Sequence, residues 1–79
     1  MSGVTKAQMW QTLKGIDWNI DVDSLHDDAP LREQGLDSLD MVNLLLTMEE
    51  EYAVVIPDEA LPELATLKDI RDFINGKAS

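Results

Sequence analysis

A serine flanked by aspartates is the residue of this chain whose surroundings best suit chemistry. Ser38 stands in the segment Gly35-Leu36-Asp37-Ser38-Leu39-Asp40. Asp37 is a good helix N-cap residue, and Asp40 follows three positions later, as the acid of a capping box does. This spacing predicts that Ser38 is the first residue of a helix, beside unpaired backbone N–H groups and the positive end of the helix dipole. A phosphate attached to its hydroxyl would be electrostatically favoured there.

Neither catalysis by Ser38 nor a metal site is predicted. A serine hydroxyl is a weak nucleophile without an adjacent base, and nothing in the sequence places the single histidine, His26, beside it. The chain has no cysteine and no second histidine to complete a transition-metal site. Residues 17–21 imitate the start of a calcium loop, but Val22 stands where such a loop needs glycine. We therefore expect no metal and no enzymatic activity.

The helix predicted over residues 38–52 must position Ser38, and it carries two kinds of surface. Its apolar side chains at helical spacing are predicted to face a core, namely Leu39, Val42, Leu45, Leu46 and Tyr52. A polar stripe follows steps of three and four, with two more acids beside it: Asp40, Asn43, Thr47 and Glu50, then Glu49 and Glu51. The helix holds more apolar residues than one face can hide, so we expect some of Met41, Leu44 and Leu46 at its edges or surface.

Further helices are predicted on both sides of this one. The first covers residues 4–15, with an apolar stripe and a glycine stop: Val4, Ala7, Trp10 and Leu13, then Gly15. Residues 16–36 are predicted to be an extended loop that lays Trp18, Ile20 and Val22 onto the helices, with one short helical turn at 23–25.

After Tyr52, a short helix is predicted from Asp58, limited to one or two turns by Pro62. The last helix follows a capping box of Thr66 and Asp69 and ends at Gly76. Its apolar stripe is Leu67, Ile70, Phe73 and Ile74. The pattern predicts an all-α fold, a small four-helix bundle with a short third helix and a long first loop.

Size and charge limit the functions open to the chain. Its 79 residues predict one domain, residues 1–79, with frayed ends at about 1–3 and 76–79. Sixteen acids against six bases give a formal charge of −10. Such a surface repels nucleic acid and anionic lipid, and it attracts proteins with basic patches. No apolar stretch is long enough to span a membrane, so we expect a cytoplasmic monomer with neither nucleic acid nor membrane as a partner.

The segment around Ser38 resembles the attachment motif of the acyl carrier protein family. Glu49-Glu50-Glu51-Tyr52 and Ile56-Pro57-Asp58-Glu59 resemble the same family at the expected distances, and the resemblance extends from about Val4 to Ile74. It implies that a phosphopantetheinyl transferase attaches 4′-phosphopantetheine from coenzyme A to Ser38. It also implies that acyl groups are then carried as thioesters for enzymes of fatty acid, polyketide or related lipid synthesis. At Gln34, Asn43 and Pro62 the sequence departs from the residues usual in this family, which favours a specialised carrier.

The resemblance also implies roles for other residues. The family presents acids to basic patches on partner enzymes at positions that match Asp37, Asp40, Glu49 and Glu50, and an apolar contact at Leu46. Residues that resemble the lining of an acyl cavity are Leu45, Met48, Leu64 and Ile70, although a closed core is equally consistent with the sequence. Two alternatives stay open: a peptidyl or aminoacyl carrier, and an unmodified acidic helical adaptor in which Ser38 only begins a helix. Asp37 and the acidic helix favour acyl over peptidyl cargo.

Overall fold

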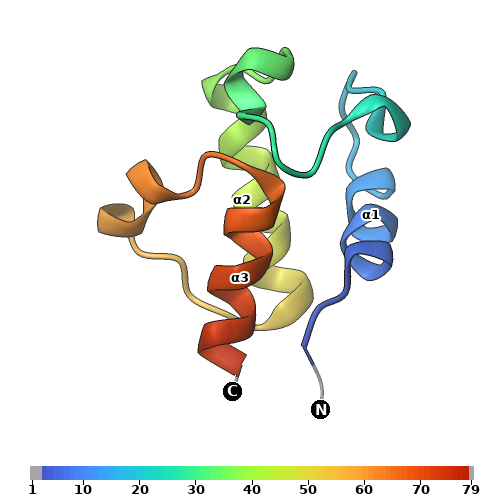
Figure 1. Ribbon diagram of the computed structural model, residues 1–79. Coiled ribbons are helices and arrows are strands. Elements are labelled where there is room, and N and C mark those ends of the chain that lie inside the picture. The colour runs from blue at the N-terminus through green and yellow to red at the C-terminus, as the bar shows by residue number, and fades with distance from the viewer. Residues whose placement is uncertain (1–2, 79) are drawn as a thin grey trace.

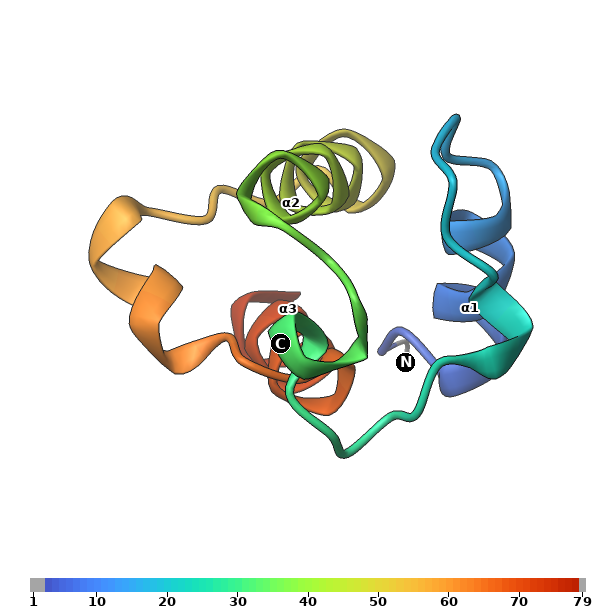
Figure 2. The same cartoon turned by 90° about the horizontal axis from the view of Figure 1, so that it is seen from above.

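Three α-helices and three short 3-10 helices form the part of the chain that this computed structural model describes, residues 3–78, with side chains described over 3–76. The elements are α1 (Lys6–Lys14), η1 (Val22–Ser24), η2 (Leu31–Gln34), α2 (Ser38–Tyr52), η3 (Asp58–Glu63) and α3 (Leu67–Ala78). This part of the chain contains no strand, so the predicted all-α class is confirmed. In Figure 1 the long axes of α1, α2 and α3 run in roughly the same direction. Figure 2 shows these helices from above, with η3 projecting to one side.

The core between these helices is entirely apolar among the described residues. The three α-helices contribute seven of the thirteen buried side chains: Met9, Leu13, Leu44, Met48, Leu67, Ile70 and Ile74. The other six come from the connecting segments: Val22, Leu25, Leu31, Leu36, Ile56 and Leu64. Burial of apolar surface is the main favourable term in folding, so the connections hold the fold together nearly as much as the helices do.

Helix α2 turns a different face to the core from the one predicted. Leu44 and Met48 are fully buried, whereas Leu39, Val42 and Leu46 are 75%, 52% and 53% exposed. Of the predicted core residues, only Leu45 and Tyr52 pack against the core, and both are half-buried. The prediction was wrong for the other three because α2 carries two apolar seams, and both follow helical spacing.

The first helix is shorter than predicted and is fixed by caps at both ends. Thr5 and Gln8 form a reciprocal capping box that the sequence analysis missed, and Gly15 is the C-cap, which confirms the predicted stop. Met9 and Leu13 are buried, whereas Ala7 is exposed, so the predicted stripe was wrong at Ala7. The Tyr52 hydroxyl joins α2 to this helix through a 2.7 Å hydrogen bond with the Thr12 hydroxyl.

The long first loop packs as predicted and is tied to α3. Val22 is buried, and Trp18 and Ile20 are half-buried against the core. Asp27 accepts two hydrogen bonds from the Arg71 guanidinium, at 2.6 and 2.9 Å, and its carbonyl accepts one from the backbone N–H of Lys68. The hydrogen bonds from Arg71 hold the pKa of Asp27 below its ordinary value, against the opposing effect of burial.

Between α2 and α3 the chain forms η3, a short 3-10 helix that packs loosely. Ala53 ends α2 in the left-handed conformation, with φ 55°. The element η3 then extends over six residues, includes Pro62 and has no buried side chain, which confirms the predicted limit of two turns. Helix α3 begins with the predicted Thr66–Asp69 capping box, but it continues past Gly76 to Ala78, so the predicted stop was wrong. The predicted frayed ends lie partly outside the described residues, at 1, 2 and 79.

Candidate functional site

Ser38 occupies the position that the sequence predicts, at the start of α2. Asp37 is the N-cap: its side chain accepts a 2.8 Å hydrogen bond from the backbone N–H of Asp40, and the Asp40 carboxylate accepts one of 3.2 Å from the Asp37 N–H. Ser38 is exposed, and its hydroxyl makes no hydrogen bond to another described residue. A bulky group can therefore be attached to this oxygen without breaking a contact that holds the fold.

The segment before Ser38 is held in one conformation by a glycine and a glutamine. Gly35 has φ +102°, a left-handed conformation that L side chains rarely adopt, and it ends η2 just before α2. The Gln34 side chain accepts a hydrogen bond from the His26 N–H at 2.7 Å and donates to the carbonyls of His26 and Ala29. The unusual glutamine thus has a structural role, because its amide crosslinks the long loop behind the serine.

An apolar groove of about 380 Å³ opens beside Ser38, between α2 and η3. Met41, Val42 and Leu45 form its α2 wall, and the other wall is formed by Leu61, Pro62, Leu64 and Ala65. Ser38, Pro30 and Arg32 complete the lining.

The four residues predicted to line an acyl cavity divide between this groove and the core. Leu45 and Leu64 line the groove, whereas Met48 and Ile70 are fully buried in the core and are absent from its lining. Arg32, Val42 and Leu61 line it without having been predicted to do so. Because the groove joins residues from three separate segments, no local sequence pattern could have identified all of its lining.

The predicted recognition acids have different surroundings. Asp37 and Asp40 cap α2. The Glu49 carboxylate accepts a 2.7 Å hydrogen bond from the backbone N–H of Ile56 and so ties the segment after α2 to the helix. Glu50 is exposed, and its side chain contacts no other described residue through a hydrogen bond or ion pair. Of these four acids, Glu50 is therefore the one with no structural role in the described part of the chain.

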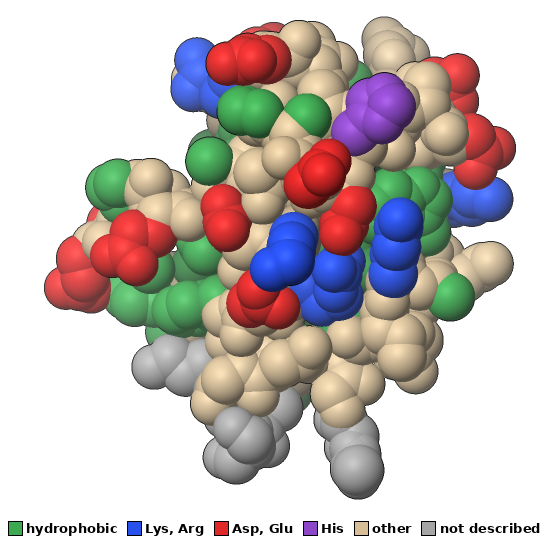
Figure 3. Space-filling view, in the orientation of Figure 1, with side chains coloured by type: hydrophobic (Ala, Val, Ile, Leu, Met, Phe, Trp, Pro, Cys, Tyr) green, Lys and Arg blue, Asp and Glu red, His purple; other side chains and the backbone are tan. Residues whose placement is uncertain are grey.

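An exposed apolar stripe follows α2 next to these acids. Leu39, Val42 and Leu46 recur at helical spacing on its outer side, and Leu61 of η3, 41% exposed, lies with Val42 and Leu46 around a smaller hollow of about 140 Å³. Helix α2 has four acids and no basic residue. Figure 3 shows basic side chains gathered on the face where α3 lies in front, and α3 carries Lys68 and Arg71. The molecule thus offers an apolar and acidic surface along α2.

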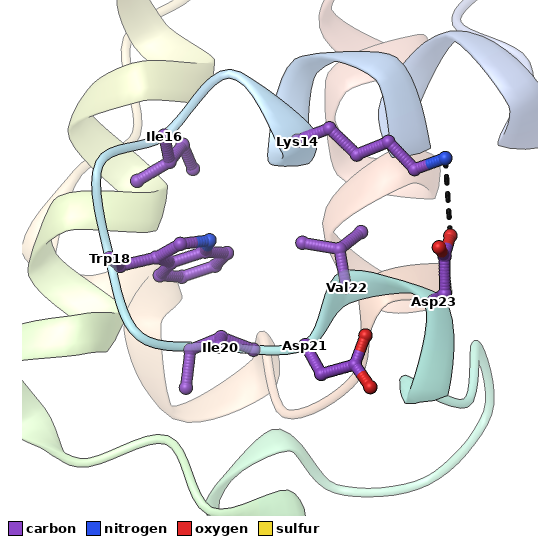
Figure 4. Close-up of a pocket in the computed structure, with 7 residues that line it drawn as sticks. All are labelled: Lys14, Ile16, Trp18, Ile20, Asp21, Val22 and Asp23. Atoms are coloured by element: carbon purple, nitrogen blue, oxygen red, sulfur yellow. Dashed lines mark ion pairs between the residues drawn. The ribbon is translucent and has the colours of Figure 1, made fainter.

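A second hollow, of about 310 Å³, lies in the long loop and is separate from the Ser38 site. Figure 4 shows Trp18 pointing across this loop toward Val22, with the Lys14–Asp23 ion pair, 3.1 Å long, at one side. The Trp18 indole nitrogen is buried and has no hydrogen-bond partner. No α2 residue lines this hollow. Within the described residues, no group of three His, Asp or Glu side chains could hold a metal ion, and none of the helices is long and apolar enough to cross a membrane.

Comparison with known proteins agrees with this geometry. The profile of a family described as "Phosphopantetheine attachment site" matches residues 8–74. An acyl carrier protein of Thermosynechococcus vestitus is 40% identical over 62 residues, which cover 77% of this chain and 76% of that protein.

Among solved structures, a similar chain occurs in the crystal structure of an engineered Bradyrhizobium japonicum glycine:[carrier protein] ligase complexed with a carrier protein from Agrobacterium tumefaciens and AMP. The TM-score is 0.71 with 32% identity, over 92% of this chain and 99% of that one. A small helical domain with an unbonded serine hydroxyl at a helix start has the features of a carrier of a covalently attached group. The chain belongs to the phosphopantetheine-bearing acyl carrier protein family.

Proposed function

We propose that 4′-phosphopantetheine is attached to Ser38 through a phosphodiester and that the chain, one carrier domain, presents acyl groups to enzymes of fatty acid, polyketide or related lipid synthesis in the cytoplasm. The observation that carries this proposal is the exposed, unbonded Ser38 hydroxyl at the start of α2. The attached group supplies a thiol, which a chain without cysteine cannot supply itself. The chain acts as a carrier and not as an enzyme, since the Ser38 hydroxyl makes no hydrogen bond to a described side chain that could act as its base.

We further propose that α2 is where partner enzymes dock, the phosphopantetheinyl transferase included. Its exposed stripe of Leu39, Val42 and Leu46 provides apolar contact, and Glu50 provides an unengaged negative charge at the same surface. A partner with an apolar site and a basic rim would be complementary to this surface. The similar carrier protein in complex with a ligase supports docking of an enzyme on this fold.

The groove beside Ser38 is our proposed shelter for the acyl chain. Leu45 and Leu64, two of the residues expected to line a cavity, stand on its opposite walls. Met48 and Ile70 lie fully buried in the core, and a chain that reached them would have to displace core contacts.

Aminoacyl cargo is the second candidate, and one observation favours it. The carrier protein of similar structure was crystallised with a glycine:[carrier protein] ligase and AMP. An amino acid needs less apolar shelter than a fatty acyl chain, so the two candidates differ in their use of the groove. Mass spectrometry of the thioester on protein purified from its native cell separates them.

Attachment is tested by intact mass after incubation with coenzyme A, Mg²⁺ and a broad-specificity phosphopantetheinyl transferase. We expect one pantetheine adduct on the wild-type chain and none on Ser38→Ala. Ser24→Ala is the matched control, because Ser24 is also exposed and its hydroxyl donates only to the nearby Asp21 carbonyl. An adduct on Ser38→Ala, or no adduct on folded wild-type protein, would refute the assignment and favour the unmodified adaptor.

Docking through α2 is tested by charge reversal at Glu50. Glu50→Lys should slow the transferase more at low salt than at high salt, since exposed charges are screened by salt. Asp17→Lys makes the same change of net charge on the long loop and serves as the control. Asp40 is less informative, because its reversal would also break the capping box. Equal slowing by the two variants would remove α2 as the docking surface.

A further inference from the structure

Arg32 differs from the other cations of the described chain in having no partner. Each of the others whose side chain is described is engaged by a carboxylate or an aromatic ring. These pairs are Lys6 over Trp10, Lys14 with Asp23, Lys68 with Asp72 and Arg71 with Asp27. Arg32 is exposed and has no ion pair, hydrogen bond or ring contact through its side chain. The chain has sixteen acids and six bases. Because carboxylates are in such excess, an unpaired guanidinium is unexpected.

The position of Arg32 in the groove suggests a function for its unpaired charge. Arg32 and Ser38 line the same groove, one from η2 and the other from the start of α2. The backbone that carries Arg32 is held firmly: the neighbouring Leu31 is fully buried, and its N–H donates a 2.8 Å hydrogen bond to the carbonyl of Ala65. The three hydrogen bonds of Gln34 fix the other end of η2. An anchored backbone therefore presents a free cation to the groove that the proposed attachment residue also lines.

We propose that the Arg32 guanidinium pairs with the phosphodiester on Ser38 and so directs the first part of the pantetheine arm along the groove between α2 and η3. The inference rests on the attachment proposed above. Guanidinium and phosphate form short, charge-assisted hydrogen bonds with a matching fork geometry. The remaining charged neighbours of Ser38, Asp37 and Asp40, are acids and would repel the same phosphate.

Such an ion pair would change the fraction of molecules in which the pantetheine arm lies in the groove. With the phosphate held on the η2 side, the arm starts over the apolar walls formed by Leu45 and Leu61, and not over the exposed Leu39. An exposed ion pair changes such a population ratio by about 1.5- to fivefold. Arg32 would thus be a positioning residue, one that favours sheltered cargo while leaving the arm free to swing out to a partner.

The test uses holo-protein with a nitroxide label on the thiol of the arm. Paramagnetic broadening of the Leu61 and Leu64 methyl signals reports arm in the groove, and broadening of Leu39 reports arm outside it. The variants are Arg32→Gln, Arg32→Lys and, as a control with the same loss of charge on α3, Lys68→Gln. Circular dichroism and the ³¹P signal of the phosphodiester accompany each sample.

We expect the groove-to-outside ratio to fall about 1.5- to fivefold in Arg32→Gln, to recover in part in Arg32→Lys, and to stay unchanged in Lys68→Gln. High salt should lower the ratio in the wild type and in Lys68→Gln, which both keep Arg32, but not in Arg32→Gln. The ³¹P signal should shift in Arg32→Gln and stay unchanged in Lys68→Gln. An unchanged ratio in folded Arg32→Gln holo-protein overturns this inference alone. Failure of the folded wild type to accept the arm overturns the proposed attachment and this inference with it. A variant that alters only rates with a partner enzyme would assign Arg32 to docking and refute the positioning role.

Discussion

Replacing Glu49 by alanine separates the structural role of that acid from its proposed role in recognition. The substitution removes the acceptor of the 2.7 Å hydrogen bond from the Ile56 N–H. A hydrogen bond to a charged group contributes about 1.5–3 kcal/mol, and the partial exposure of this one places it near the lower value. Loss of an acid near the C-terminal end of α2 returns about 0.3–0.5 kcal/mol. The net loss of stability should therefore be about 1 kcal/mol, or roughly 4–8 °C in melting temperature for a domain of this size.

Glu50→Ala is the matched control, since it removes the same charge one residue further along α2 from a side chain that contacts no other described residue. We expect it to leave stability unchanged or slightly raised, because it relieves the same unfavourable interaction with the helix dipole. Glu49→Gln keeps an acceptor oxygen at the same reach and should lie between the two.

Thermal melts measure the difference, and hydrogen exchange at the Ile56 amide locates it. The amide should exchange faster in Glu49→Ala than in the wild type, while amides of α3 are unaffected under native conditions. Equal melting temperatures for Glu49→Ala and Glu50→Ala, with unchanged exchange at Ile56, would show that the hydrogen bond does not hold this segment. In that case Glu49 would count as a free recognition acid beside Glu50.

Three further predictions concern the long loop and its links. Asp27→Asn should cost about 1–3 kcal/mol at pH 7, because it leaves the largely buried Arg71 charge without its carboxylate. Since the pKa of Asp27 is lowered from 3.8 chiefly by the Arg71 hydrogen bonds, the carboxylate stabilises the fold above pH 3.8 and ceases to do so as the pH falls through its folded pKa. Urea titrations should therefore show wild type and variant converging in acid, and a constant gap would refute this. Gly35→Ala should lower the free energy of unfolding by about 1–2 kcal/mol through its positive φ alone, because a Cβ there would have no other atom within 4 Å. Gly76→Ala, within α3, should raise the free energy of unfolding by up to about 1 kcal/mol. Equal melting temperatures for these two variants would contradict both expectations. Gln34→Leu should cost about 1–2 kcal/mol, because it removes the side chain that pairs with the backbone of His26 and Ala29, and faster exchange of the His26 amide would report it.

Features that depend on adjacent residues were predictable from the sequence. The capping boxes of Asp37 with Asp40 and of Thr66 with Asp69 each need only two side chains three residues apart, and the structure contains both. The start of α2, and with it the position of Ser38, follows from the first of these boxes. The role of Gln34 was not predictable, because its partners lie five and eight residues earlier in an irregular loop.

The core face of α2 was not predictable from its own residues. One apolar seam contains Leu39, Val42 and Leu46, and the other contains Met41, Leu44, Leu45, Met48 and Tyr52. Helical periodicity alone gives no reason to prefer one seam. The larger seam faces inward because the side chains supplied by the other elements, from Met9 to Ile74, meet it there, and those contacts are set by tertiary structure.

The same ambiguity explains the proposed docking surface. A helix that served only the fold could replace Leu39, Val42 and Leu46 by polar residues and lose little, because all three are more than half exposed. A stripe of exposed apolar residues that leads to acids opposing the helix dipole stabilises neither the helix nor the core. A role outside the isolated domain accounts for both features together, since a partner would bury the apolar stripe and pair with the acids at its end. Apolar residues on two faces of α2 made its core face unpredictable. The same distribution is expected of a helix that is buried on one face and binds enzymes with the other.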